Sequence, residues 1–509
     1  MKDSYQNCEN EIFDLYLNRE LFNERNSIDF MVGSAFDGND FNDRAPVHTS
    51  GLEIIVRPEC NQKCEYCYVA RYGHELYPLS ERVSNEVLLK NLDMLLTYIF
   101  TTRHTYINHF ELFAGDLFYD DFYFDILDVF WNHLSSLYHE YPSIFKAFSG
   151  LILTPCNFSF IDDDEKVAKV ERYMEQFKTI NWDIGFSIST DGKEMVEGRE
   201  QRELPEDHFD KLFKWTERHH KSGFHAIISA ANVKNMIKSY DWWKEQYDKY
   251  YVQQKEIHPF TRDFLPYWLE ARNDEWTDEA IEDYLKFIDY AYADRFAMHD
   301  NDPEKMAYHI FVGDEKMEGT LPKLAQNDPI RLSVNVQAQH IHEIGCSMTH
   351  LVCVTLNNFA FIPCHRLNYP QFRGGYLTLN DDKTAIEGCE AFNAAGLLAA
   401  KFCHSDSRPK CATCIYAKVC DKGCLGAQFE STGELFQPAL TVCRLFKAWY
   451  NHLVLLYKDT GVYDAAYSMR LIKPEQASYL DAILDAAIKD RETKRHFEIS
   501  GGVTHGICP

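Results

Sequence analysis

The sequence predicts an α/β fold in which a mostly parallel sheet forms a partial barrel, with a β-hairpin and further helices nearer the C-terminus. Short apolar runs rich in β-branched residues alternate with longer segments whose apolar residues recur at helical spacing. Such alternation is typical of parallel sheets covered by helices. The 509 residues, 45% hydrophobic and 14% aromatic, are enough for two or three compact units.

The first predicted strand, residues 52–57, reads LEIIVR and leads directly into a cysteine-containing loop. Five further strand-like runs follow at residues 109–113, 150–153, 184–189, 225–229 and 264–270. Helical periodicity is clearest in residues 84–100, 207–220 and 278–292. In barrels of this kind the chemistry collects at the carboxyl ends of the strands, so the first loop lies where a catalytic site is expected.

Charge and composition narrow the possible partners and compartment. A formal net charge of −26 repels phosphate backbones, so we expect no nucleic-acid partner. The opening MKDSYQNCENEIF lacks the pattern of an export signal, and no apolar run of about 18 residues predicts a membrane span. We therefore expect a cytoplasmic protein. In that reducing compartment 16 cysteines indicate metal binding or catalysis rather than disulfides.

One cysteine group follows the first strand: Cys60, Cys64 and Cys67 in the run CNQKCEYC. Thiolates at such spacing suit zinc or an iron–sulfur cluster. Three cysteines without a fourth nearby leave one coordination position open. An open position does not suit a structural zinc site, but it is valuable where a small molecule must bind iron.

A second group lies near the C-terminus, where Cys411, Cys414, Cys420 and Cys424 form the run CATCIYAKVCDKGC and Cys443 follows. This spacing also suits zinc or iron–sulfur clusters. Taken alone, the group could be a zinc knuckle.

The first group resembles the motif of the radical S-adenosylmethionine superfamily. The CxxxCxxC triplet follows the first strand, and the aromatic Tyr66 stands just before the third cysteine. The resemblance implies that Cys60, Cys64 and Cys67 hold a [4Fe–4S] cluster whose open iron binds S-adenosylmethionine. Reductive cleavage of that cofactor would give a 5′-deoxyadenosyl radical that abstracts a hydrogen from the substrate.

The family resemblance also implies residues that contact the cofactor. After the second strand the family has a Gly-Gly-Glu-Pro motif that receives the methionine amine, and here Ala114, Gly115 and Asp116 stand in its place. Asp116 keeps a carboxylate acceptor, although the motif itself departs from the family pattern. A plain strand-ending turn is the alternative interpretation.

The run FSISTDG resembles the family's fourth strand end, where a serine faces the ribose of the cofactor. We expect Ser187 and Ser189 in that role, with Asp191 close behind them. Arg199, or alternatively Arg202, could bind the cofactor carboxylate, because arginine suits bidentate recognition.

The C-terminal spacing resembles the SPASM/twitch extension of one branch of this superfamily. That pattern also needs an upstream pair, which Cys346 and Cys364 provide. Residues 352–362 between them predict a hairpin. The family usually has glycine five residues before the second of the pair, where this chain has Phe359. We expect Asn358 to supply the left-handed turn conformation.

Carried over by residue, the resemblance implies two auxiliary [4Fe–4S] clusters and therefore three clusters in total. The first would use Cys346, Cys364 and Cys424, with Cys353 either a fourth ligand or a buried thiol. If Cys353 does not bind, one iron stays open for substrate. The second cluster would use Cys411, Cys414, Cys420 and Cys443.

The implied architecture is a partial (β/α)6 TIM-like barrel followed by a C-terminal SPASM domain. Its expected segments are an N-terminal extension (1–48), the barrel (49–295), a connecting segment (296–345), the cluster domain (346–443) and a helical tail (444–509). Helices are expected over residues 444–456 and 474–494.

Members of this branch act mostly on peptides or proteins. The resemblance therefore implies oxidative modification of a ribosomally synthesised peptide, by a carbon–carbon, carbon–oxygen or thioether crosslink. Expected partners are that peptide, with a leader segment, and a reductant such as flavodoxin or ferredoxin. One alternative is formylglycine-type sulfatase maturation, with His365 as the base where relatives have aspartate. Radical oxidation of a small molecule is another alternative.

Overall fold

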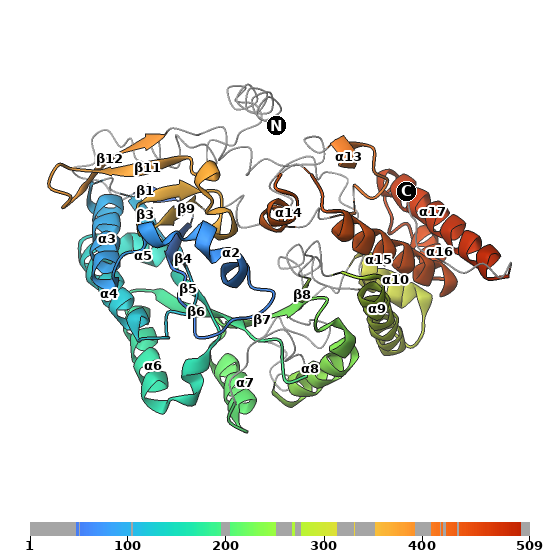
Figure 1. Cartoon of the computed structure of the whole chain (residues 1–509). Coiled ribbons are helices and arrows are strands. Elements are labelled where there is room, and N and C mark those ends of the chain that lie inside the picture. Colours follow the sequence, from blue (N-terminus) through green and yellow to red (C-terminus); the bar gives the residue numbers. More distant parts are fainter. Residues whose placement is uncertain are drawn as a thin grey trace. The chain divides into compact units, whose positions relative to one another are not determined.

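A computed structural model describes the chain over residues 47–49, 51–102, 105–194, 204–250, 267–269, 276–312, 330, 352–391, 409–417, 419–420, 424–434 and 437–499 (Figure 1). The chain divides into two compact units. The first comprises residues 1–226 and 345–403, and the second comprises residues 227–344 and 404–509.

A mostly parallel sheet organises the first unit. In the described part of the chain, ten strands follow the order β12-β11-β10-β9-β2-β4-β5-β6-β7-β8. Neighbouring strands from β2 to β7 run parallel, and β9 joins β2 in parallel on its other side. The sheet is open, with β12 and β8 at its ends. The predicted α/β class is therefore confirmed.

All six predicted strands of the main series are present. They are β2 (Leu52–Arg57), β4 (His109–Ala114), β5 (Gly150–Cys156), β6 (Trp182–Ser189), β7 (Gly223–Ile228) and β8 (Tyr267–Leu269). β7 crosses the boundary between the units, and its last two residues belong to the second. A separate pair of short parallel strands is formed by β1 (Val47–Thr49) and β3 (Thr105–Ile107).

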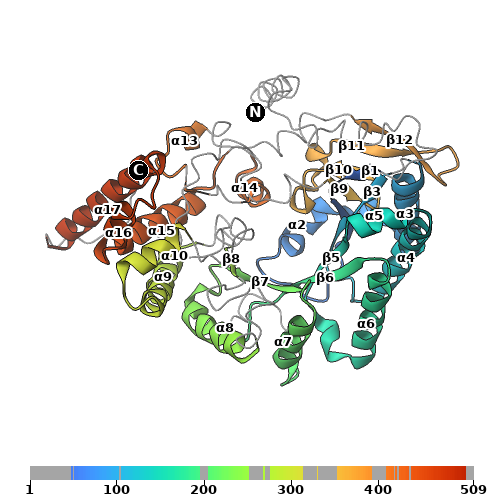
Figure 2. The ribbon, with the colours of Figure 1, turned by 180° about the vertical axis from the view of Figure 1, so that it is seen from behind.

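Helices of the first unit line one face of the sheet, as both ribbon views show for α3, α4, α6 and α7 (Figures 1 and 2). Side-chain caps mark two of their starts: Ser84 accepts from the Val87 amide, and Asp163 accepts from the amides at the start of α6. Their bounds are α2 (Tyr68–Leu76), η4 (Leu79–Glu81), α3 (Asn85–Thr97), the π-helical η5 (Tyr98–Thr102), α4 (Phe122–Glu140), α5 (Pro142–Ala147), η6 (Ser159–Asp162), α6 (Asp164–Lys178) and α7 (His208–Arg218).

The predicted hairpin is also present and extends the main sheet. β9 (Val352–Thr355) pairs in parallel with β2 and antiparallel with β10 (Ala360–Ile362). The meander continues through η12 (His365–Leu367), η13 (Pro370–Phe372), β11 (Gly375–Leu379) and β12 (Ile386–Ala391).

The hairpin turn differs from the prediction in one detail. Phe359 itself has a φ of 57°, whereas Asn358 is outside the left-handed region. The expectation for Asn358 was therefore wrong. Phe359 is only 3% exposed, so burial of its ring offsets the cost of the left-handed backbone.

The second unit is mainly helical in its described part. It contains the strand β8 and the helices η7 (Val233–Asn235), α8 (Met236–Tyr250), α9 (Asp278–Met298), α10 (Pro303–Phe311), α13 (Pro409–Ala412), α14 (Leu425–Thr432), α15 (Leu440–Asp459), α16 (Val462–Ser468) and α17 (Pro474–Ile499). α15 packs against α9, α16 and α17 (Figure 2). The predicted helices near residues 278–292, 444–456 and 474–494 are confirmed, and α10 lies in the predicted connecting segment.

Among the helices that the structure describes, none is both long and apolar enough to cross a membrane.

Candidate functional site

The first cysteine group lies on the loop between β2 and α2, at the carboxyl end of a parallel strand. β2 ends at Arg57, and Cys67 directly precedes the first residue of α2. The Cys67 amide donates to the Cys64 carbonyl at 2.9 Å, which closes a turn between the second and third cysteines. The loop therefore has the location that the sequence predicts for it.

The next strand, β4, holds this loop through its backbone. The Gly115 amide donates to the Arg57 carbonyl at 2.9 Å, and the Asp116 amide donates to the Glu59 carbonyl at 2.7 Å. A Cβ atom on Gly115 would lie 2.1 Å from the Glu59 oxygen and 2.4 Å from the Pro58 oxygen. Only glycine fits this approach of two backbones. Asp116 is fully buried beneath the loop, and its Oδ1 accepts from the Phe118 amide at 3.0 Å.

β5 provides a second attachment, which the sequence analysis missed. Asn157, directly after β5, donates from Nδ2 to Oδ1 of Asn61 in the cysteine loop. Asn61 in turn donates to the Ser159 hydroxyl at 3.3 Å. Phe158 between these partners has a left-handed φ of 60°. The sequence signal was the polar residues immediately after an apolar strand.

The third attachment comes from the end of β6. The Tyr66 hydroxyl donates to Oδ2 of Asp191 at 2.6 Å, and both side chains are buried. Ser187 and Ser189 lie at alternate positions of β6, so they share one face of the sheet. The structure therefore brings Tyr66 together with the β6 end in which the cofactor-binding serines were predicted.

The thiols of the first group influence one another. Partial desolvation and the neighbouring Asp116, Cys67 and Cys64 raise the pKa of Cys60, although the residue is exposed to solvent. The Gln62 amide donates to the Cys60 sulfur at 3.4 Å, and this hydrogen bond acts in the other direction by lowering the pKa of Cys60. Binding of metal would have to displace the proton, as it does at other thiolate sites. Three thiols on a loop with fixed backbone fit the donor set that an iron–sulfur cluster requires.

A second polar group lies on β2 and the hairpin. Glu53 is 1% exposed, and its Oε1 accepts from the His365 amide at 2.9 Å. His365 Nδ1 and Cys353 Sγ each lie 3.1 Å from the same oxygen. The His365 ring stacks on Phe113 with 3.8 Å between the ring centroids. His365 and Cys353 were predicted from the sequence, whereas Glu53, an acidic residue within an apolar strand, was not.

The electrostatics of Glu53 follow from these contacts. Burial by itself would raise the pKa of Glu53, but the nearby His365 and the hydrogen bonds from His365 and Cys353 outweigh burial. The net result is a pKa below the ordinary value of a glutamate. Glu53 is therefore a buried carboxylate stabilised by its donors.

Tyr77, directly after α2, is a buried tyrosine near cysteines of both the first group and the hairpin region. Burial raises the pKa of Tyr77, and four neighbouring acidic groups add to the shift: Cys353, Glu53, Cys67 and Cys364. The third cysteine of the first group and the second cysteine of the predicted upstream pair therefore lie near one buried tyrosine.

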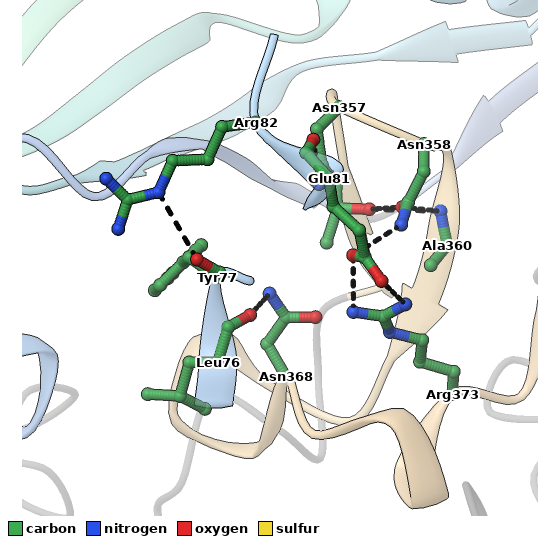
Figure 3. Close-up of polar contacts among 10 residues, drawn as sticks. Leu76, Tyr77, Glu81, Arg82, Asn357, Asn358, Ala360, Asn368 and Arg373 are labelled. Carbon is green, nitrogen blue, oxygen red and sulfur yellow. Dashed lines mark hydrogen bonds and ion pairs between the residues drawn. The ribbon is translucent and has the colours of Figure 1, made fainter. Parts of the chain in front are cut away.

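Figure 3 shows the polar contacts that fix the segment after α2 to the hairpin. Arg373 binds Glu81 through two hydrogen bonds of 2.9 and 2.8 Å, and Asn358 donates to the same carboxylate at 3.0 Å. Asn368 donates to the Leu76 carbonyl at 2.8 Å. A charge-assisted bidentate pair is strong and directional, so Arg373 and Asn358 together fix the hairpin turn and the segment before β11 to η4, the turn after α2.

The C-terminal cysteines are arranged by local turns in the second unit. The Cys414 amide donates to the Cys411 carbonyl at 3.0 Å, and the Cys420 amide donates to the Tyr416 carbonyl at 2.8 Å. Cys424 directly precedes α14, and Cys443 lies in the first turn of α15.

Several predicted residues lie outside the described part of the chain: Cys346, Arg199 and Arg202. Among the described residues, no three His, Cys, Asp or Glu side chains converge closely enough to hold a single metal ion. A cluster does not require such convergence, because each thiolate binds a different iron.

No protein-family model matches this sequence, and no curated protein matches it significantly.

Proposed function

We propose that this chain is a radical S-adenosylmethionine enzyme that oxidatively modifies a ribosomally synthesised peptide. The observation that carries the proposal is the cysteine loop after β2, which β4, β5 and β6 each hold at their carboxyl ends. In the proposed architecture β2 and β4 to β8 form the partial (β/α)6 barrel, and the hairpin belongs to the SPASM domain.

The residues of this chain have distinct proposed roles. Cys60, Cys64 and Cys67 would hold the first [4Fe–4S] cluster, and Asp116 would accept the methionine ammonium group. When bound, the cluster and S-adenosylmethionine supply the radical that removes a substrate hydrogen. The remaining ligands and contacts are those that the sequence resemblance implies: Ser187, Ser189 and Arg199 for the cofactor, and the C-terminal cysteines for the auxiliary clusters.

Anaerobic purification and reconstitution test the cofactor assignment. Wild-type protein should contain iron and sulfide and release 5′-deoxyadenosine from S-adenosylmethionine under reduction. Replacement of Cys60, Cys64 and Cys67 by alanine should abolish that release. Cys508→Ala is the matched control, because Cys508 belongs to neither cysteine motif. Zinc without iron in the wild-type protein would overturn the proposal.

The substrate class needs its own experiment. A short peptide encoded beside this gene should lose about two mass units when it is co-expressed with the enzyme, because the crosslink removes two hydrogens. An unchanged peptide mass together with active cofactor cleavage would direct the search to a protein or small-molecule substrate.

One observation favours a second candidate, formylglycine formation on a protein side chain. His365 is held by Glu53 and Phe113, so its ring has a fixed orientation of the kind that a general base needs. His365→Ala with full turnover would exclude His365 as that base.

A further inference from the structure

The stretch between the first two cysteines of the loop depends on one side chain for its attachment. Backbone hydrogen bonds hold the loop to β4 ahead of Cys60 and close a turn between Cys64 and Cys67. Between these two points, within the part of the chain that the structure describes, the loop is hydrogen-bonded to another strand end only through Asn61. The groups that hold Asn61 therefore hold the stretch that separates the first two cysteines.

Asn61, Asn157 and Ser159 form a hydrogen-bonded group, which we call the asparagine network. Oδ1 of Asn157 accepts from the Ser159 amide at 3.1 Å, so Nδ2 of Asn157 is the group that faces the loop. This Nδ2 donates to Oδ1 of Asn61, and Nδ2 of Asn61 donates to the Ser159 hydroxyl at 3.3 Å. Because each amide has one acceptor atom and one donor atom, the bond to the Ser159 amide determines the orientation of both asparagines.

Phe158, between the two network residues that follow β5, has a left-handed backbone with a φ of 60°. This conformation is unfavourable for a residue with a Cβ atom. The Phe158 ring is fully buried, with its centroid 4.3 Å from that of Phe160 and 5.5 Å from that of Trp215. Burial of the ring offsets the strain and holds the turn that directs both network residues towards the loop.

We propose that the asparagine network positions the stretch between Cys60 and Cys64 for cluster binding before any metal is present. The inference rests on the proposed function and adds residues that set the geometry of the first cluster. Asn157 and Ser159 act through Asn61, so they are positioning residues. A loop that the folded chain already orders loses little conformational entropy when its thiolates bind metal. Supporting contacts of this kind orient metal ligands in other proteins.

Tryptic digestion of the metal-free protein tests whether the network holds the loop. Lys63 is exposed within the stretch, and cleavage there requires the loop to open. Asn157→Ala should accelerate cleavage after Lys63 about tenfold, because it removes hydrogen bonds that oppose opening. Mass spectrometry of the fragments gives the rate.

Asn181→Ala is the matched control for this digestion. Asn181 also has a φ of 60°, but its Nδ2 donates to the Phe145 carbonyl of α5 at 2.6 Å and not to the loop. This variant should leave cleavage after Lys63 near the wild-type rate. Equal acceleration in both variants, or no acceleration in Asn157→Ala, would overturn the inference.

A spectroscopic titration of the reconstituted protein separates positioning from a merely structural role. Electron paramagnetic resonance of the reduced protein with added S-adenosylmethionine should show about tenfold weaker cofactor binding in Asn157→Ala. Ser159→Ala removes one hydroxyl acceptor of the network and should give a smaller change in the same direction. Asn181→Ala should bind the cofactor as the wild type does.

Unchanged cofactor binding in Asn157→Ala, or equal weakening in Asn181→Ala, would overturn the inference. Absence of iron from the wild type would contradict the proposed function instead. The tryptic comparison needs no metal, so it would still decide whether the asparagine network holds the loop.

Discussion

The two cysteine groups are built in different ways. The loop carrying Cys60, Cys64 and Cys67 is attached to three successive strand ends, with partners as distant in sequence as Asp191. The described cysteines of residues 411–443 are arranged by turns that connect residues three or four positions apart. The first group is attached to distant strand ends, whereas the second combines short turns with a tertiary hydrogen bond from the Tyr416 hydroxyl to Asn451 of α15.

This difference has a thermodynamic consequence for metal binding. Where tertiary contacts already fix a loop, little chain entropy remains to be lost when a metal binds. Where short turns supply most of the described backbone contacts of the ligands, metal binding and local folding are more strongly coupled. Under the proposed function we therefore expect the two groups to respond differently to the removal of iron, and four experiments test this difference.

The largest expected effect is that of iron removal from the reconstituted protein. Anaerobic chelation should increase amide hydrogen exchange in residues 409–443 by about tenfold or more, equivalent to about 1.4 kcal/mol of opening free energy. The amides of Gly115 and Asp116 should change less, because their hydrogen bonds join the end of β4 to the loop after β2, two segments far apart in the sequence. Mass spectrometry of peptic fragments gives both values. Equal increases of hydrogen exchange in the two regions would contradict the expected difference between the two cysteine groups.

Gly115→Ala is expected to disrupt the first region alone. The added Cβ would meet backbone oxygens of Glu59 and Pro58 at 2.1 and 2.4 Å, so the loop must move. We expect a loss of about 1–3 kcal/mol in the free energy of unfolding and, under the proposed function, less iron at the first cysteine group. Gly73→Ala in α2 is the matched control, since its nearest contact is 3.7 Å away and alanine favours helix. Denaturant titration and iron analysis compare the two variants.

Tyr66→Phe removes one of the three attachments and leaves the ring in place. The lost hydrogen bond to the buried Asp191 should lower the free energy of unfolding by about 1–2 kcal/mol and weaken S-adenosylmethionine binding. Tyr173→Phe removes an exposed bond of the same length, 2.6 Å, to Asp128. Denaturant melts should show a smaller loss for this control. Equal losses would mean that Asp191 is not a special anchor for the loop.

Acid should weaken the ion pair between Arg57 and Asp120 at the start of the first loop and thereby lower the stability of the fold. Arg57 precedes the loop and binds Asp120, and this contact lowers the pKa of Asp120 from 3.8 to about 2. A depressed pKa in the folded state contributes stability above about pH 4, which is lost as the pH falls towards 2. Because Asp120 is 40% exposed, screening limits the contribution to about 1 kcal/mol or less. Asp120→Asn should flatten this part of the stability–pH profile, and an unchanged profile would remove Asp120 from the account.

The sequence predicted the positions of the strands better than it predicted which strands pair with one another. Periodicity and composition located β2 and the start of the cysteine loop correctly, because a short run of apolar β-branched residues strongly favours a β-strand over other secondary structure. The same reasoning found the hairpin at residues 352–362 but not its parallel pairing with β2. Pairing between strands about 300 residues apart depends on the packing of the whole unit, which local periodicity does not encode.

The candidate site shows the same limit. Its cysteines, Tyr66 and His365 were identified from their residue types and spacing, since those features reflect chemistry that is local in sequence. Glu53 and Asn157 were missed because their importance comes from partners on other strands. Phe359 was misjudged for a related reason, since burial of its ring determines which turn residue adopts the left-handed conformation.

By itself the sequence determined the α/β class, the strand series and the two cysteine groups, because periodicity and ligand spacing are properties of neighbouring residues. The attachment of the first loop to three strand ends, and the contacts of Glu53 with Cys353 and His365, became visible in the folded chain alone. Those contacts join residues far apart in the chain, and their geometry is fixed by strand register and side-chain packing.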